Sequence, residues 1–219
     1  MTVIRIEAVT DMLCPWCYVG KKNLDRAIEL YRETDPSAEF QVAWKPFYLS
    51  PAMKNSGYDK RTVYTRTFSA AGDFETAFER ISSDCSRAGI KLDISGTTGN
   101  SRQCHKLIAL ALMKGFDVQD RLLDALFRGH FEEGADISDR EFLLAAAAEA
   151  GLDEHEAARV LDSERAGEIV DGEVIRARKA GVNGVPTFTI QGRWRVGGKQ
   201  EPDVFLRVVE RVAEGGRSE

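Results

Sequence analysis

The sequence predicts an α/β fold whose sheet is built from the two ends of the chain and whose middle is all-helical. Apolar and polar residues alternate with a period of two near the N-terminus and again after residue 186, as they do in strands. Between about residues 50 and 163 this alternation gives way to apolar residues at helical spacing. No repeat, low-complexity tract or Pro/Gly-rich linker separates the parts. We therefore assign residues 1–50 and 164–219 to a core domain and residues 51–163 to a helical insertion domain.

The N-terminal part predicts a strand, a helix and a second strand. The first strand covers residues 3–9, and the helix begins at Pro15, because the missing N–H of proline costs nothing in a first turn. This helix ends before Asp35-Pro36, since a residue that precedes proline is pushed out of the α region. Alternation over residues 40–45 indicates the second strand, and the three elements form a βαβ unit.

The middle of the chain carries apolar stripes at helical spacing. Two capping patterns, from Ser138 to Glu141 and from Asp153 to Glu156, predict the starts of two further helices. We expect no strand between residues 60 and 160. The stripes comprise Phe74, Phe78, Ile81 and Cys85; Leu107, Ala111 and Leu112; and Leu122, Leu123, Leu126 and Phe127.

The C-terminal part returns to the α/β pattern. A helix over about residues 166–180 stops at Gly181, and residues 187–190 and 194–196 form a hairpin across Gln191-Gly192. Pro202 opens a closing helix.

The composition narrows the possible partners and the compartment. Thirty Lys and Arg residues against 35 Asp and Glu give a net charge of −5 with both signs interspersed, so we expect no nucleic-acid or membrane partner. The N-terminus lacks the basic start and apolar run of a signal peptide, and no stretch reaches the ~20 apolar residues of a membrane span. We expect a cytoplasmic protein, in which four cysteines indicate thiol chemistry or metal binding rather than a disulfide framework.

The strongest functional signal is Cys14-Pro15-Trp16-Cys17, at the junction of the first strand and the first helix. A thiolate at a helix N-terminus is stabilised by unpaired N–H groups and by the helix dipole, so Cys14 is the predicted nucleophile. Cys17 lies one helical turn further in, within reach of a mixed disulfide formed at Cys14. Disulfide exchange needs this division between an attacking and a resolving thiol.

A zinc site is the alternative for a C-x-x-C pair, because the same spacing occurs in zinc knuckles. Zinc would require a second closely spaced pair. The remaining cysteines, Cys85 and Cys104, are isolated from each other, and His105 is the only neighbouring imidazole. We therefore favour redox chemistry and predict no metal ligands.

Three motifs together resemble one protein family. They are Asp11-Met-Leu-Cys-Pro-Trp-Cys-Tyr-Val-Gly20, Gly181-Val-Asn-Gly-Val-Pro-Thr-Phe188 and Gly198-Lys-Gln200. The chain resembles the thioredoxin-fold proteins of the DsbA type, and within them the cytoplasmic FrnE-like dithiol-disulfide oxidoreductases, which are related to 2-hydroxychromene-2-carboxylate isomerases. The resemblance covers nearly the whole chain. It implies a thioredoxin fold interrupted by an inserted all-helical domain.

The resemblance also implies a cis peptide bond between Val185 and Pro186. Such a bond would turn the backbone of Val185 towards the thiols, where an extended substrate segment could pair with it by strand addition. We assign Pro15, Trp16, Val185 and Pro186 to substrate binding. For Trp16 two roles stay open, covering the thiols to tune their potential and forming an apolar contact surface.

Asn100 and His105 match an Asn…His pattern that faces the active-site cleft in this family, and on that resemblance they are also assigned to substrate binding. The alternative is a helix N-cap and a polar helical residue, and both interpretations stay open. The family usually has alanine before the histidine, so Cys104 is expected to be a small, buried structural thiol. Cys85 continues an apolar stripe and is predicted to be a packed core thiol.

The other polar residues near these motifs are predicted to lie at the solvated surface. Asp11 is predicted to be solvated beside a turn, with a buried acid that relays protons from Cys17 as the alternative. His130 and His155 have no partners at ligand spacing and are expected at the surface. Three basic residues near the helix start are expected to form a solvated face. The alternative is that their positive charge stabilises the thiolate. They are Lys21, Lys22 and Arg26.

The residues predict a thiol–disulfide oxidoreductase or isomerase that acts on protein or small-thiol substrates. We expect no bound cofactor, with glutathione as the candidate co-substrate. The alternative is a glutathione-dependent transferase or isomerase of the kappa or 2-hydroxychromene-2-carboxylate isomerase type, in which serine typically stands at the position of Cys14. A third hypothesis is a zinc-holding or chaperone-like binding module, whose chaperone role would survive loss of both cysteines.

Overall fold

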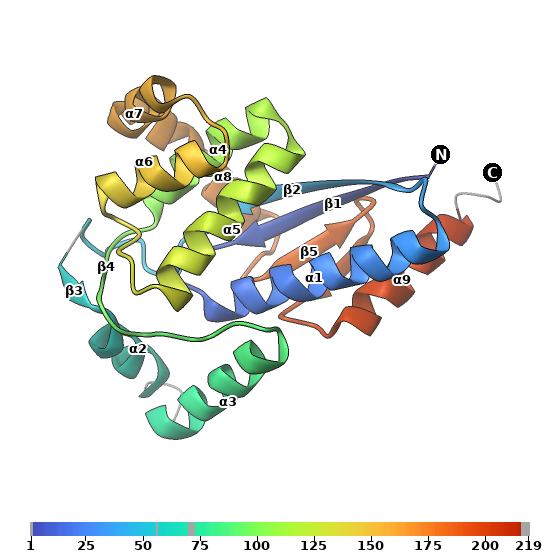
Figure 1. Cartoon of the computed structure of the whole chain (residues 1–219), viewed down its shortest axis with the longest axis horizontal. Coiled ribbons are helices and arrows are strands. Elements are labelled where there is room, and N and C mark those ends of the chain that lie inside the picture. Colours follow the sequence, from blue (N-terminus) through green and yellow to red (C-terminus); the bar gives the residue numbers. More distant parts are fainter. Residues whose placement is uncertain (1, 56, 70–72, 216–219) are drawn as a thin grey trace.

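The computed structural model describes residues 2–55, 57–69 and 73–215. Its centre is a four-stranded mixed sheet with the strand order β2, β1, β5, β6 (Figure 1). β2 runs parallel to β1, whereas β5 is antiparallel to β1 and β6 is antiparallel to β5. The four strands are β1 (Val3–Thr10), β2 (Glu39–Pro46), β5 (Thr187–Ile190) and β6 (Trp194–Gly197). The sheet is therefore assembled from the two ends of the chain, as the alternation predicts.

Two helices from opposite ends of the chain lie side by side on the sheet. α1 (Pro15–Thr34) connects β1 to β2, and α9 (Pro202–Gly215) follows β6 and packs along α1 (Figure 1). Pro15 occupies the first turn of α1, and the helix ends at Thr34, immediately before Asp35-Pro36, as expected. The hairpin of β5 and β6 and the helix start at Pro202 are confirmed as well.

The insertion consists mainly of helices, some of which pack on the edge strand β2. α4, α5 and α8 all contact β2, whereas α2 and α3 lie beside the start of α1 (Figure 1). The helices of the insertion are α2 (Lys60–Ser69), α3 (Phe74–Arg87), α4 (Arg102–Lys114), α5 (Phe116–Glu132), α6 (Arg140–Glu149) and α7 (Glu154–Asp162), and α8 (Glu164–Lys179) follows them at the start of the C-terminal part.

Two local predictions for this part are wrong. A short antiparallel pair, β3 (Tyr58–Asp59) and β4 (Thr97–Thr98), interrupts the helical block, so the expectation of no strand between residues 60 and 160 fails at β4. Two-residue strands leave no alternation to detect. The N-cap of α6 is Asp139 rather than Ser138, because the Ser138 hydroxyl donates to Asp136 instead. The cap of α7 at Asp153 is confirmed.

The outer edge of β2 is held by a side chain of the insertion. Gln119 of α5 is fully buried, and its amide makes two hydrogen bonds to the main chain of Trp44. The Trp44 N–H donates to Gln119 Oε1 over 2.8 Å, and Gln119 Nε2 donates to the Trp44 carbonyl over 2.9 Å. The same nitrogen also donates to the Ile108 carbonyl over 3.1 Å. The insertion is thereby tied to the sheet by hydrogen bonds as well as by packing.

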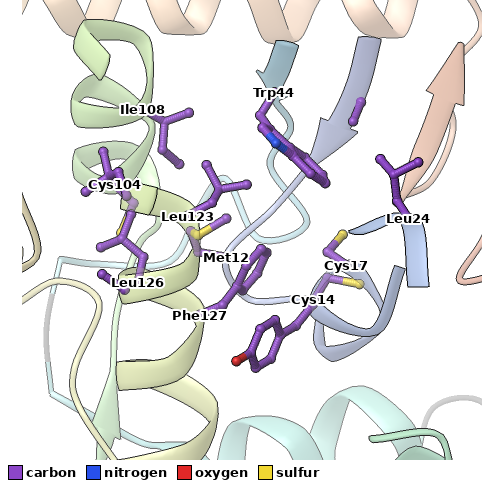
Figure 2. Packing of buried hydrophobic residues seen from close by; sticks show 14 of the residues in the cluster. Met12, Cys14, Cys17, Leu24, Trp44, Cys104, Ile108, Leu123, Leu126 and Phe127 are labelled. Atoms are coloured by element: carbon purple, nitrogen blue, oxygen red, sulfur yellow. The ribbon is translucent and has the colours of Figure 1, made fainter. Parts of the chain in front are cut away.

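One large apolar cluster joins the sheet, α1 and the insertion. It includes Ile4 and Ile6 of β1, Leu24 of α1 and Leu123 and Phe127 of α5, all at most 1% exposed. The residues around Cys14 and Cys17 belong to this same cluster (Figure 2). Within the described ranges, no helix is both long and apolar enough to span a membrane.

Candidate active site

Cys14 is the N-cap residue of α1, directly before Pro15. Its N–H donates to the Asp11 carbonyl over 3.1 Å, and its carbonyl accepts the N–H of Cys17 over 3.0 Å, so a tight turn fixes the motif. The Cys14 thiol is buried and donates to the carbonyl of Val185 over 3.6 Å. The cysteine predicted as the nucleophile therefore faces the proline loop from a helix N-terminus, where a negative charge is favoured.

Cys17 lies one turn inside α1 and is completely buried. Burial raises the pKa of Cys17 well above its usual value, and the hydrogen bond and charge of Cys14 raise it further. The Thr10 hydroxyl and the Asp11 main chain act in the opposite direction and lower this pKa. Cys17 is thus held as a neutral thiol beside Cys14, as a resolving cysteine would be before it is needed.

The Val185-Pro186 peptide bond is cis, as the resemblance implies. The Pro186 carbonyl accepts the N–H of Gly198 over 2.9 Å, which links this loop to the Gly198-Lys-Gln200 motif. Gly20 of α1 lies against the loop, and a Cβ at this position would be 3.1 Å from Pro186 Cγ and 3.2 Å from the Phe188 ring. Because glycine stands here, α1 approaches the proline closely enough to bring Cys14 to Val185.

The Trp16 side chain points towards α3 of the insertion. Its indole Nε1 donates to Asp84 Oδ2 over 3.1 Å, and its ring packs edge-on against Phe68 with 5.7 Å between centroids. Asp84 is nearly buried and also accepts from Lys199 Nζ over 2.5 Å and from Arg87. One carboxylate therefore joins the Cys14–Cys17 motif, the insertion and the segment after β6.

The prediction that Asp11 is solvated is wrong, because its side chain is completely buried. Its carboxylate accepts the N–H of Leu49 over 2.6 Å and the N–H of Leu13 over 3.4 Å. Asp11 Oδ1 also lies 3.6 Å from His105 Nε2. The carboxylate thus anchors the loop that carries Cys14, with one hydrogen bond supplied by backbone 38 residues away.

Asn100 and His105 lie at the start of α4, whose N-cap residue is Ser101 rather than Asn100. Asn100 Oδ1 accepts the N–H of Arg102 at the start of α4, as a capping residue would, and its Nδ2 donates to the Met53 carbonyl over 2.8 Å. His105 is buried, and its Nε2 lies 3.1 Å from the Phe47 carbonyl and near Asp11. Asn100 is placed against the loop around residue 53, whereas His105 reaches the loop beneath Cys14 through Asp11.

The expectation of a solvated basic face near the helix start is wrong for Lys21. Its side chain is completely buried, and its ammonium lies 2.9 Å from Asp25, 3.0 Å from Asp120 and 3.1 Å from Asp124. Burial lowers the pKa of Lys21, but the three carboxylates outweigh this effect and raise it overall. Lys22 also pairs with Asp124. These lysines therefore bind the insertion to α1.

His130 is also buried rather than exposed, contrary to prediction. Its Nδ1 lies 3.2 Å from the Ala135 carbonyl and its Nε2 lies 3.4 Å from the Tyr64 hydroxyl, which donates to the Leu13 carbonyl over 3.1 Å. Burial lowers the pKa of His130 to about 3, so the imidazole is neutral at pH 7. His155 is exposed, as expected.

The two remaining cysteines are packed thiols, as predicted. Burial raises the pKa of Cys85 to about 12, and Cys104 is fully buried and donates to the Ile137 carbonyl over 3.2 Å. Cys104 lies at the far side of the apolar cluster from Cys14 and Cys17 (Figure 2). In the part of the chain that the structure covers, no group of three or more His, Cys, Asp or Glu side chains could hold a metal ion.

Two polar residues next to the motif have no distinguishing signal in the sequence. Asp84 resembles any acid on the polar side of a helix, and its partners Trp16 and Lys199 lie 68 and 115 residues away. Thr10 ends a predicted strand, where a threonine is common.

Comparisons with known proteins agree with this architecture. The family model of the DSBA-like thioredoxin domain matches residues 5–210. A crystal structure of a probable DsbA oxidoreductase from Streptomyces coelicolor is 27% identical, with 97% of this chain and 90% of that chain covered and a TM-score of 0.81. A 2-hydroxychromene-2-carboxylate isomerase is 18% identical, with 98% of both chains covered and a TM-score of 0.71. The cytosolic disulfide reductase DsbM from Pseudomonas aeruginosa, solved with GSH, is 20% identical, with 94% of this chain and 98% of that chain covered and a TM-score of 0.61.

Proposed function

Because the chain belongs to the family of DSBA-like thioredoxin domains, we propose that it is a thiol–disulfide oxidoreductase or isomerase whose Cys14 and Cys17 exchange disulfides with protein or small-thiol substrates. The observation that carries this proposal is the unequal environment of the two thiols. Cys14 caps α1 and faces Val185, whereas Cys17 is buried one turn deeper with its pKa raised by burial. This asymmetry suits one attacking and one resolving thiol.

The proposed reaction has two exchange steps. The Cys14 thiolate attacks one sulfur of a substrate disulfide, an S–S bond forms at Cys14, and the other substrate sulfur leaves as a thiolate that takes up a proton. Cys17 then loses its proton, and its sulfur attacks Cys14 Sγ. The Cys14–Cys17 disulfide forms, and the second substrate sulfur leaves and is protonated. The substrate disulfide gains two electrons and the dithiol loses them, and the reverse sequence donates a disulfide.

Substrate binding is proposed at Pro15 and Trp16, between the two cysteines, and at Val185 and Pro186 of the facing loop. An extended substrate segment would pair with the main chain of Val185, whose carbonyl already accepts from the Cys14 thiol. Pro186 would hold this segment against α1. Trp16 and Pro15 would form an apolar wall, since the Trp16 ring packs on Phe68 and Pro15 lines a small apolar pocket with the same Phe68.

Glutathione is the proposed small-thiol co-substrate, and the cytoplasm is the proposed compartment. The support is the cytosolic disulfide reductase of the same fold that was solved with GSH. In this proposal glutathione reduces the Cys14–Cys17 disulfide by two successive exchanges, and oxidised glutathione leaves. The protein itself would hold no permanent cofactor.

The test is a redox titration of the purified protein in glutathione buffers, combined with an insulin reduction assay. We expect a single two-electron transition of the Cys14–Cys17 pair and measurable insulin reduction. Cys14→Ser should abolish both, whereas Cys85→Ala and Cys104→Ala should retain both. Full insulin reduction by a protein that lacks Cys14 and Cys17 would contradict the proposal.

A glutathione-dependent transferase or isomerase is the second candidate. The observation that favours it is the shared fold with 2-hydroxychromene-2-carboxylate isomerase over 98% of both chains. A single thiol suffices for such an activity, so Cys17→Ser would retain it while losing disulfide exchange. Glutathione conjugation or isomerisation that survives in Cys17→Ser would therefore favour the second candidate over the first.

A further inference from the structure

The hydroxyl of Thr10 is buried without a hydrogen-bond partner. Thr10 is the last residue of β1 and is completely inaccessible to solvent. Among the residues that the structure describes, no donor or acceptor meets its Oγ1 at hydrogen-bond geometry. Buried polar side chains are rarely left unpaired, because burial removes their hydrogen bonds to water. A hydroxyl in this position calls for an explanation.

The main chain of Thr10 is fixed, so only its hydroxyl can respond to a neighbour. The Thr10 carbonyl accepts the N–H of Phe47 over 2.9 Å, in continuation of the β1–β2 ladder. The hydroxyl lies beside the sulfur of Cys17, which is also completely buried. The Asp11 main chain approaches the same sulfur. Two polar groups at the end of β1 therefore meet one thiol inside an otherwise apolar cluster.

A neutral thiol is stabilised little by nearby hydrogen-bond donors, whereas a buried thiolate is stabilised strongly by them. Sulfur in the S–H form is a weak acceptor, but the charged form is an acceptor of charge-assisted hydrogen bonds. The resolving step creates a negative charge on Cys17 in a site that water does not reach. Donors that are already in place stabilise such a charge most effectively, and their hydrogen bonds often shorten only when the charge appears.

We propose that the Thr10 hydroxyl is a catalytic hydrogen-bond donor to the Cys17 thiolate in the resolving step. This inference rests on the proposed dithiol function. In that step the Cys17 proton leaves, the Thr10 O–H turns towards the sulfur, and the sulfur attacks Cys14 Sγ of the mixed disulfide. The bond between Cys14 and the substrate sulfur breaks, and the departing substrate thiolate takes up a proton. Thr10 keeps its own proton throughout.

The two exchange steps can be measured separately with dithiobis(nitrobenzoate), an aryl disulfide that releases a coloured thiolate. Attack by Cys14 releases the first coloured thiolate at a rate proportional to reagent concentration. Resolution by Cys17 releases the second at a rate that becomes independent of this concentration when the reagent is in excess. Stopped-flow absorbance therefore reports both steps in one experiment, and Cys17→Ser should show only the first.

Thr10→Val is the decisive variant, because it replaces the hydroxyl by a methyl group of similar size. We expect the second phase to slow at least tenfold and its pH profile to move to higher pH, while the first phase keeps its rate. Thr10→Ser, which restores the hydroxyl, should return the second phase to within about threefold of wild type. The thermal stability of Thr10→Val should equal or exceed that of wild type, since the lost hydroxyl has no partner in the resting protein.

The outcomes separate this inference from the proposed function. A second phase of wild-type rate in Thr10→Val would overturn the role of Thr10 while leaving the dithiol function intact. Equal slowing of both phases, or a loss of stability that Thr10→Ser shares, would mean that Thr10 is merely structural. A wild-type protein that releases only one coloured thiolate would instead refute the dithiol function itself.

Discussion

Replacement of Asp84 by leucine should loosen the contact between the Cys14–Cys17 motif and the insertion. The change removes the acceptor of the Trp16 indole N–H, which lies 3.1 Å away, and the counter-charge of Lys199 and Arg87. Asp84 is 10% exposed at its side chain, whereas Lys199 and Arg87 are 31% and 55% exposed. The buried hydrogen bond should therefore matter more than the two ion pairs.

The magnitude follows from these exposures. An unpaired indole N–H in a part-buried site costs ~1–3 kcal/mol. A half-exposed ion pair such as that of Lys199 adds at most ~1 kcal/mol, and the exposed Arg87 adds less. We expect Asp84→Leu to lower the free energy of unfolding by about 2–3 kcal/mol in urea titrations.

The control and a double-mutant cycle make this prediction specific. Glu201 faces the same two cations at 3.7 and 3.9 Å but is 52% exposed, so Glu201→Gln should change the free energy of unfolding by less than about 0.5 kcal/mol. In a Trp16→Phe background, which has no indole N–H, Asp84→Leu should cost about 1–2 kcal/mol less than in wild type. Equal effects of the Asp84 and Glu201 substitutions, or strict additivity with Trp16→Phe, would refute the reasoning.

The same contact has a predicted pH dependence. Burial raises the pKa of Asp84, but its hydrogen bonds to Lys199 and Trp16 outweigh this effect, so the folded-state pKa lies below the unfolded one. The stabilisation is therefore present above the unfolded value of about 3.9 and is lost as the pH falls through the lower, folded-state value. Wild type should lose more stability than Asp84→Leu on acidification below about pH 4.

Three further predictions concern the thiols, the buried lysine and the proline loop. Cys17→Ser should accumulate mixed disulfides on non-reducing gels and Cys14→Ser should not, since only the first keeps the attacking thiol; adducts on Cys14→Ser would refute this. Lys21→Met should lower the free energy of unfolding by about 3–5 kcal/mol at pH 7, because three carboxylates lose their buried cation. Part of that loss should disappear below about pH 6, where the pKa of Asp25, raised to about 6 by burial, allows protonation; a pH-independent loss would contradict the ion-pair explanation. Gly20→Ala should slow insulin reduction several-fold, since its Cβ would displace Pro186; unchanged turnover would show that the loop adapts.

Secondary-structure elements that depend on local periodicity can be predicted from the sequence. Contacts between residues that are far apart in the sequence cannot. The strands at both ends and the helix that starts at Pro15 follow from alternation, helical spacing and proline chemistry, and the structure has them within a few residues. The sequence wrongly predicts a solvated position for Asp11, Lys21 and His130. The identity of a polar residue does not show which side chains or main-chain groups it contacts in the folded protein. Their partners come from residues 49, 120 and 64 respectively.

The candidate site divides in the same way. The proposed roles of Cys14 and Cys17 follow from their spacing and from the strand–helix junction, which are local features. The approach of Val185 to Cys14 joins residues 171 positions apart, and only the family resemblance anticipates it. Asp84 and Thr10 escape prediction because their significance lies in the side chains that they face in the folded protein.

The amide of Gln119 occupies hydrogen-bonding groups at an edge of the sheet. β2 is an edge strand, and an edge strand exposes N–H and C=O groups that can recruit a strand from another molecule. Gln119 offers one donor and one acceptor to the main chain of Trp44, so at that position it stands in for the next strand of the sheet. The insertion thereby blocks strand addition to this edge at Trp44. The other edge of the sheet is β6, whereas Val185 and Cys14 face each other beside the ends of the two central strands, β5 and β1. An extended polypeptide that pairs with Val185 would therefore bind at the end of the sheet and not along β2.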